Sequence, residues 1–420
     1  MILYYYMIRS AVDYIPLSNT GFIGALIDCF NPYRPKPYIT HSNINTILGY
    51  SCRSLFDTIM NYYNTEKKEL RILTTPIHHT SFRNIIEKYV KPENIYILEM
   101  NDEFNEIISI PKDVDDEPIT VDLCIVSHMF GQDLKMDTLY EYKLKNPKCI
   151  MIEDRVQGGY FEKKISNDFI DIALYSTGMD KKPCGLGGGF INIRNNFEGN
   201  VSLKNYVLNK VRNYPQQYFY HRVIELIKKI PTILIYNSKT TIGTILYFFS
   251  LFKIDLHGFV SKYRKTNPGF QHNNYNKNPS NGTLISIHKS LNRVNDIEQN
   301  YYKVTNKFFK ALDNDMKIKY FPWVKNDYLL TPYNTILVEN REEFIDFLNK
   351  SNIAVLENPT WKIFNFAYKN SEKYKKFNNS LVYIPSLPIM TDEEINYLVF
   401  KINNYKRPPA PAKPSTVPSL

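Results

Sequence analysis

The sequence predicts an α/β protein: a large, mostly parallel sheet with helices on both faces, followed by a smaller C-terminal α+β domain. The 420 residues are 43% hydrophobic and 14% aromatic, enough for two domains of ordinary size. Between residues 41 and 193, apolar strand-like runs alternate with amphipathic stretches, the pattern of parallel strands joined by helices. A second series of helices and strands follows from about residue 284.

Apolar runs in the first domain are expected to form strands, and the amphipathic stretches between them to form helices. Ligands of parallel sheets bind at the carboxyl ends of the strands. Thr75, His128, Asp154 and Ser176 stand at four of these ends, which marks that edge as a candidate site. The strands are 70–75, 94–100, 121–128, 148–154, 171–176 and 188–193, and the helices are 54–63, 81–89 and 136–145.

The rest of the chain begins with a largely helical region at 200–265 and a polar loop at 267–282. A long helix at 284–312 follows from its apolar rhythm, and Thr391 with Glu394 predicts a capping box. Further strands are expected at 334–338, 353–356 and 380–385, with helices at 342–350 and 391–404. The predicted organisation is an arm (1–40), a large domain (41–265), a small domain (266–406) and a disordered Pro-rich tail (407–420).

Charge and composition exclude several classes of protein. The net charge is +10, but the lysines are scattered, which indicates a basic surface and no nucleic-acid partner. No apolar run approaches the roughly 20 residues of a membrane span, so no membrane association is expected. The five cysteines have no close spacing, which predicts neither a zinc site nor disulfides and favours the reducing cytoplasm.

Two adjacent lysines, Lys181 and Lys182, lie in a polar loop between the strand at 171–176 and the glycine-rich segment 185–189. A lysine amine forms Schiff bases with carbonyl cofactors. Upstream, Asp154 ends another apolar strand, where its carboxylate would keep a pyridine nitrogen protonated. Gln157 is expected to reach an oxygen on the same ring. The residue types alone do not choose between the two lysines.

Two further segments fit a phosphorylated ring cofactor. Ser51 to Ser54 precedes an apolar helix, whose first N–H groups would bind phosphate; an ordinary serine cap is the alternative. His78 and His79 follow a strand, where a flat side chain would stack on a ring. The alternatives for the histidines are a plain surface pair and a metal site. No third ligand with suitable spacing is evident, so no metal is expected.

Together these segments resemble the DegT/DnrJ/StrS family of sugar aminotransferases, a branch of the fold-type-I pyridoxal-phosphate enzymes. The resemblance runs from about residue 40 to 405. It implies a homodimer that transfers an amino group from an amino acid such as glutamate to a keto-sugar carried on a nucleotide. It rests on Ser51 to Leu55, Pro76 to His79, His128 to Gln132, Ile152 to Gln157, Ser176 to Lys181 and the C-terminal stretch from Ile384 to Asn404.

The resemblance also implies individual roles. Lys181, five residues after Ser176, would form the Schiff base with pyridoxal 5'-phosphate. Asp154 would pair with the ring nitrogen, and Gln157 would contact the ring hydroxyl. Ser176 and the backbone of Cys52 and Arg53 would hold the phosphate, and His79, ahead of His78, would stack on the ring.

The sequence departs from the family pattern at several points. Cys52 replaces the usual glycine, Arg155 and Val156 replace a small Ala-Ala pair, and Thr177 replaces an aromatic residue. These changes bear on the substrate more than on the cofactor. One alternative is a lyase or desulfurase of the same fold, although Cys184 lies too close to Lys181 to act as a mobile nucleophile. The other is a degenerate relative that binds a sugar nucleotide without catalysis.

Overall fold

The computed structural model describes residues 19–129, 133–158, 165–179, 181–230, 233, 275–320, 334–353, 355–357, 361–363, 371–384 and 390–405. The predicted tail at 407–420 and residues 1–18 of the predicted arm lie outside these ranges. So do residues 234–265 of the region expected to be helical. Within the described ranges, no helix is both long and apolar enough to cross a membrane.

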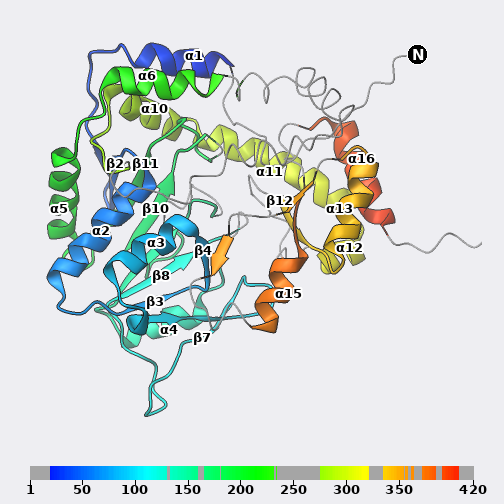
Figure 1. The fold of residues 1–420 in the computed structure, drawn as a ribbon, viewed down its shortest axis with the longest axis horizontal. Helices are drawn as coiled ribbons and strands as arrows, with labels where there is room; N and C mark the ends of the chain where they lie inside the picture. Colours follow the sequence, from blue (N-terminus) through cyan, green and yellow to red (C-terminus); the bar gives the residue numbers. More distant parts are fainter. Residues whose placement is uncertain are drawn as a thin grey trace, which may run out of the picture.

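An eight-stranded sheet forms the middle of the larger part of the molecule, in the order β1-β2-β11-β10-β9-β8-β3-β5 (Figure 1). Strands β10, β9, β8, β3 and β5 run parallel, which confirms the predicted fold class. The strands are β1 (Tyr38–Thr40), β2 (Ile44–Gly49), β3 (Ile72–Thr74), β5 (Ile95–Ile97), β8 (Leu123–Ser127), β9 (Ile150–Asp154), β10 (Ile172–Ser176) and β11 (Gly189–Arg194).

The expected strand at 188–193 is present as β11, but it runs antiparallel to both β10 and β2. Antiparallel neighbours can be joined by a loop, whereas parallel neighbours need a crossover connection. The connection between β10 and β11 carries both lysines and the glycines, and its described residues form no helix. The lysine loop therefore lies at the end of a hairpin, directly over the carboxyl end of β10.

Helices cover both faces of this sheet. On one face α2 (Cys52–Glu66), α3 (Thr80–Tyr89) and α5 (Asn200–Asn213) pack on strand residues such as Ile152 and Leu174. On the other face α4 (Asp137–Lys145), α10 (Asn281–Asn292) and α11 (Val294–Ala311) pack around Met151, Ala173 and Tyr175. Successive side chains of a strand thus face opposite cores, as the pleat requires.

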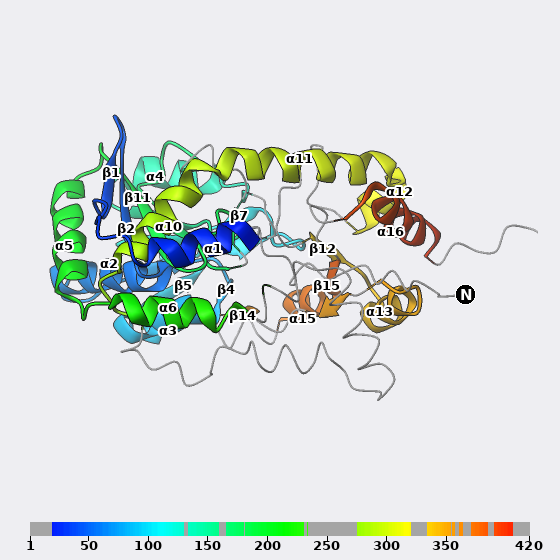
Figure 2. The same ribbon diagram turned by 90° about the horizontal axis from the view of Figure 1, so that it is seen from above.

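The predicted helix at 284–312 is two helices, α10 and α11, separated at Arg293 (φ −105°, ψ 0°). The break follows from what each half packs against. Helix α10 contacts α1 (Asn19–Asp28), α6 (Phe219–Ile227) and β2 at the large sheet. Helix α11 leads away to α16 (Asp392–Asn404) at the C-terminal end (Figure 2). The expected domain boundary at residue 265 lies outside the described residues and stays a prediction.

The C-terminal part has a three-stranded antiparallel sheet in the order β12-β15-β13. Thr391 and Glu394 form the predicted capping box at the start of α16. Its elements are α12 (Asn314–Tyr320), β12 (Asn334–Leu337), α13 (Arg341–Lys350), β13 (Leu356–Glu357), β14 (Trp361–Ile363), α15 (Glu372–Ser380) and β15 (Leu381–Ile384).

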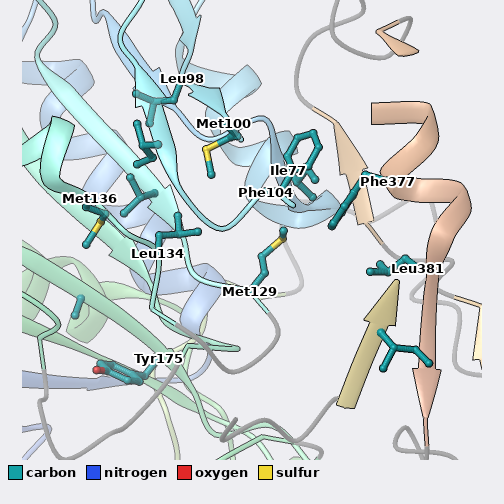
Figure 3. Close-up of a cluster of buried hydrophobic side chains, with 14 of the residues drawn as sticks. Ile77, Leu98, Met100, Phe104, Met129, Leu134, Met136, Tyr175, Phe377 and Leu381 are labelled. Atoms are coloured by element: carbon teal, nitrogen blue, oxygen red, sulfur yellow. The ribbon is translucent and has the colours of Figure 1, made fainter. Parts of the chain in front are cut away.

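The two parts meet in one hydrophobic cluster, shown in Figure 3. Phe104 follows the short strand β6 (Glu99–Met100), which pairs with β7 (Ile107–Ser109). The ring centroid of Phe104 lies 4.6 Å from the ring centroid of Phe377 on α15. Strand β14 also pairs with β4 (Ile77–His79). The C-terminal part is therefore packed against the residues that follow β3, beside the candidate edge.

Candidate active site

The sheet brings three of the four predicted strand ends together by direct contacts. Ser127 at the end of β8 lies in register with Asp154 at the end of β9. The His128 N–H donates to the Asp154 carbonyl at 3.0 Å, and the Ser127 N–H donates to Oγ1 of Thr75 at 3.1 Å. Ser176 ends the neighbouring strand, β10. The predicted edge is thus a single row of polar residues.

The N-terminus of α2 opens at the same edge. Ser51 pairs with Gly188 in an isolated bridge and caps α2, because its Oγ accepts the Ser54 N–H at 3.1 Å. Gly189 lies in register with Ser176. A Cβ on Gly189 would lie 2.2 Å from the backbone nitrogen of Cys52, so only glycine permits this approach. The first turn of α2 and Ser176 therefore flank the same glycine.

Asp154 is a buried carboxyl group, 4% exposed, whose Oδ1 accepts the Val156 N–H at 3.0 Å. Burial raises its pKa to about 6, while the Val156 N–H and the charges of His128 and Lys181 act in the opposite direction. Burial, together with Asp154, also raises the pKa of the Cys52 thiol, and the charges of Arg53 and Lys181 oppose that rise. Lys181 therefore lies within electrostatic range of both Asp154 and Cys52.

Lys182 lies in different surroundings from Lys181. Its buried Nζ is 3.2 Å from Oε1 of Glu298 on α11 and 5.9 Å from the ring centre of Tyr301. Burial lowers its pKa, and Glu298 opposes that shift. The structure thus distinguishes the two lysines by the groups around them, whereas the residue types alone did not.

Arg155 follows Asp154 in sequence but faces the opposite core, together with Glu153. Its Nη1 lies 2.9 Å from Oδ1 of Asp133 and 3.5 Å from Oε2 of Glu153. His128 Nε2 also lies 2.9 Å from Glu153. Burial alone would raise the pKa of Glu153, but Arg155 and His128 outweigh it and lower the pKa. The arginine expected beside Asp154 therefore belongs to a buried ionic network behind the sheet.

The two histidines have distinct environments. His78 is buried, its Nε2 lies 2.8 Å from Oγ1 of Thr74 and 2.9 Å from Oγ1 of Thr75, and burial lowers its pKa to about 3. His79 is partly exposed and caps α3 by accepting the Ser81 N–H at Nδ1. The structure thus accounts for His79 as a helix cap, and its stacking role stays a prediction.

Gln157 provides a test of whether the edge suits a ligand. Its Oε1 is buried and has no hydrogen-bond partner in the described part of the protein. A buried acceptor without a donor costs free energy, and such groups are rare in folded proteins. An unpaired amide oxygen three residues after Asp154 fits a bound group that carries a hydroxyl donor. Gln132 and Asp180 of the motifs lie outside the described residues.

Two residues that support the site were not predicted. Arg222 on α6 is buried and donates to the carbonyls of Gly185 at 3.0 Å and Leu186 at 3.2 Å, which fixes the glycine segment. Glu298 is the partner of Lys182. It lies in a buried helical row with Val294, Tyr301 and Thr305. A lone acid in an otherwise largely apolar helical row was the signal in the sequence that would have revealed it.

A cavity of about 310 Å³ lies between α1, α10 and the segment 184–186. Asp28 and Lys289, which form an ion pair at 2.8 Å, are both in its wall. Neither Asp154 nor Lys181 lines it, so it lies outside the polar edge described above. Across the described ranges, no cluster of three or more His, Cys, Asp or Glu side chains is arranged to hold a metal ion.

Comparison with known proteins identifies the fold. No protein-family model and no curated protein sequence matches this chain. Among solved structures, it is similar to Spr1654 of Streptococcus pneumoniae, assigned as a sugar aminotransferase (12% identity, TM-score 0.62, 95% of this chain and 97% of that one).

Two further structures show the same likeness. One is PseC of Helicobacter pylori, an aminotransferase of pseudoaminic acid biosynthesis (11% identity, TM-score 0.60, covering 94% of this chain and 98% of that one). The other is the sugar aminotransferase CalS13 of Micromonospora echinospora (11% identity, TM-score 0.55, covering 93% of this chain and 98% of that one). The chain thus has the fold of these aminotransferases over nearly its whole length.

Proposed function

We propose that this protein is a pyridoxal-phosphate-dependent aminotransferase that transfers an amino group from an amino acid to a keto-sugar. The observation that carries the proposal is that buried Asp154, Ser176 and the N-terminus of α2 lie at one edge of the sheet, with Lys181 in the loop after Ser176 and its charge acting on Asp154. Support also comes from Spr1654, whose structures of the same fold include forms with pyridoxal phosphate and pyridoxamine phosphate.

The residues at this edge fit the cofactor. Lys181 would supply the amine for its aldehyde, and Asp154 would supply the carboxylate for its ring nitrogen. Ser176 and the first N–H groups of α2, at Cys52 and Arg53, would hold the phosphate, because a helix N-terminus favours anions. The unpaired Oε1 of Gln157 would accept a hydrogen bond from the ring hydroxyl. When bound, the cofactor would supply an electron sink for the amino-bearing carbon of the substrate.

The protein's own contribution would be charge placement and proton transfer. Without a partner, Asp154 would be half-ionised near pH 6, because burial raises its pKa to about 6. A positively charged ring nitrogen would favour the ionised carboxylate, and the pair would stabilise each other in the low-dielectric interior. Lys181 Nζ would then remove a proton from the substrate carbon and return it, as general base and acid.

The finer substrate assignment is part of this proposal. We infer glutamate as amino donor and a nucleotide-linked keto-sugar as acceptor, and hence a role in amino-sugar biosynthesis. The net charge of +10 would attract a diphosphate-bearing substrate. All five cysteines are buried and free of disulfides, which supports a reducing compartment and thus the cytoplasm.

We also infer a homodimer, on the strength of an exposed apolar surface. Helices α1 and α6 lie side by side (Figure 1). The ring centroid of Phe30, just after α1, lies 6.0 Å from that of Phe219 on α6. Contiguous apolar surface of this kind marks interaction sites. Beneath this surface, buried side chains of α1 and α6 pack against Cys184 and Leu186, in the segment after the lysines. The exposed side chains are Ile23, Ile27, Phe30, Tyr33, Tyr218, Phe219, Tyr220, Ile224 and Ile227.

Borohydride trapping of the lysine–cofactor bond tests the proposed function. The protein is loaded with pyridoxal phosphate, its visible absorbance is recorded, and the reduced protein is digested and mapped. We expect a visible band and a pyridoxyl adduct on Lys181 in the native chain and in the matched control Lys182→Arg. We expect neither in Lys181→Ala. Absence of band and adduct from the native chain would contradict the proposal and favour a non-catalytic binding protein.

A further inference from the structure

One buried ion pair near the candidate site has no role in the proposed reaction. Lys182 and Glu298 form an ion pair with Nζ 3.2 Å from Oε1, and their side chains are 4% and 5% exposed. Buried ions of this kind cost several kcal/mol to desolvate, so each requires the other. The pair joins the loop after β10 to the middle of α11, a long helix of the C-terminal half.

The charged groups that act on Lys182 differ from those on which Lys181 acts. Charged groups on the elements around Lys182 are Glu298 from α11, Arg155 from the segment after β9, and Asp133, with the Tyr301 ring nearby. Arg155 belongs to the network behind the sheet, on the side opposite Asp154. The charge of Lys181 instead acts on Asp154 and Cys52. Glu298 therefore holds Lys182 on the side away from the cofactor-binding residues.

We propose that Glu298 is a positioning residue that decides which of two adjacent lysines bonds to the cofactor. This inference rests on the proposed function. Only a neutral amine can attack an aldehyde, and a lysine is a nucleophile only when deprotonated. Glu298 keeps Lys182 as an ammonium ion behind the sheet, which reserves the side facing Asp154 for Lys181. The selection thus comes from a contact between distant parts of the chain.

The first test needs no cofactor and measures the amine of Lys182 directly. In cofactor-free protein, the rate of acetylation of Lys182 by acetic anhydride is followed against pH by peptide mapping. In Glu298→Gln the ammonium loses its partner, so we expect at least about a tenfold rise in reactivity at neutral pH, one pKa unit. Asp296→Asn, an exposed acid on the same helix, is the matched control and leaves the rate unchanged. An unchanged rate in Glu298→Gln would overturn the proposal.

The second test asks which lysine the cofactor takes when Lys181 is removed. The chain is loaded with pyridoxal phosphate, reduced with borohydride and mapped in Lys181→Ala, Lys181→Ala/Glu298→Gln and Lys181→Ala/Asp296→Asn. We expect an adduct on Lys182 only in the variant that lacks Glu298. Equal labelling of Lys182 with and without Glu298, or labelling in none of the three, would overturn the selection role.

Two controls separate this inference from its premise and from misfolding. If the native chain forms no adduct on Lys181, the proposed function fails, whereas the acetylation rates still report on the Lys182–Glu298 pair. Near-ultraviolet circular dichroism checks that each variant is folded. Glu298→Asp keeps the negative charge and is expected to restore the low acetylation rate of Lys182, which a merely damaged helix would not do.

Discussion

At the scale of single residues, neighbours in sequence are sorted onto opposite sides of the sheet. Glu153 and Arg155 face one core and Asp154 faces the other, because side chains alternate along β9. The same separation reappears at Lys181 and Lys182, whose charged neighbours differ. Consecutive residues of one sequence motif therefore belong to two places: Asp154 to the candidate site, and Glu153 and Arg155 to the buried ionic network on the other side of the sheet.

Asp154 carries a prediction about stability as well as function. Its pKa of about 6 lies above the ordinary 3.8. Its contribution to the free energy of unfolding is therefore fully present below pH 3.8, where the carboxyl group is neutral, and is lost as the pH rises through 6 and the buried group ionises. At pH 8 the buried charge costs on the order of 3 kcal/mol in the cofactor-free protein. Asp154→Asn should therefore be more stable than the native chain at pH 8, and this difference should vanish near pH 4.

Urea unfolding of cofactor-free protein at several pH values checks this expectation. The exposed Asp115→Asn serves as the control and should show no such pH dependence. Pyridoxal phosphate should raise the unfolding free energy of the native chain much more than that of Asp154→Asn. If Asp154→Asn is less stable than the native chain at pH 8, the prediction is wrong, and the carboxylate is stabilised in the cofactor-free protein.

At the scale of elements, the close approach of β11 to α2 positions the proposed phosphate site. Gly189 leaves no room for a side chain against the Cys52 nitrogen, and Arg222 on α6 holds the adjoining glycine segment by its carbonyl groups. The N-terminus of α2 is thereby fixed at the end of β10. Backbone contacts of this kind cannot adjust to added atoms as flexible side chains can.

Gly189→Ala should separate β11 from α2. We expect a loss of roughly 2 kcal/mol or more in unfolding free energy, as for overpacked cores, and a loss of phosphate-dependent cofactor affinity. Gly24→Ala in α1 is the matched control: no atom lies within 4 Å of its added Cβ, so helix propensity should stabilise the protein slightly. Chemical unfolding and cofactor titration measure both effects. Native-like cofactor affinity in Gly189→Ala would contradict the assigned phosphate site.

At the scale of the whole molecule, the sheet, the lysine loop and the apolar surface on α1 and α6 are connected. The cluster that contains Phe22 and Leu226 from these helices also contains Cys184 and Leu186 from the loop. Helix α11 links the same loop to the C-terminal part through Glu298. The helices that carry the proposed dimer surface and the C-terminal part therefore both contact the loop that carries the lysines.

Ile27→Glu should weaken the proposed dimer. Ile27 is 66% exposed on α1, so a charge is tolerated in a monomer but disfavoured in an apolar interface. Sedimentation velocity should show dissociation at concentrations where the native chain is dimeric, without loss of fold by circular dichroism. Val114→Glu, at a fully exposed loop position, is the control and should sediment like the native chain. A monomeric native chain would contradict the proposed homodimer.

The strands were predictable because their signals are local. Runs such as 148–154 and 171–176 have apolar centres, and β9 and β10 occupy them with ends shifted by at most two residues. Short elements gave weaker signals. Strands β1 and β4 have three residues each, and β4 depends on pairing with β14 far along the chain. Such strands exist because of a partner that the local sequence does not reveal.

The sequence by itself determined the α/β class, the row of polar strand ends and the spacing that relates Ser176 to Lys181, because each depends on local patterns within short segments of the chain. The tertiary structure alone decided the antiparallel direction of β11, the break at Arg293 and the separate surroundings of the two lysines. These depend on contacts between residues far apart in the chain, such as Lys182 with Glu298. The free energy of a buried ion pair or a packed helix is set by the partner and by burial, and neither is visible until the chain is folded.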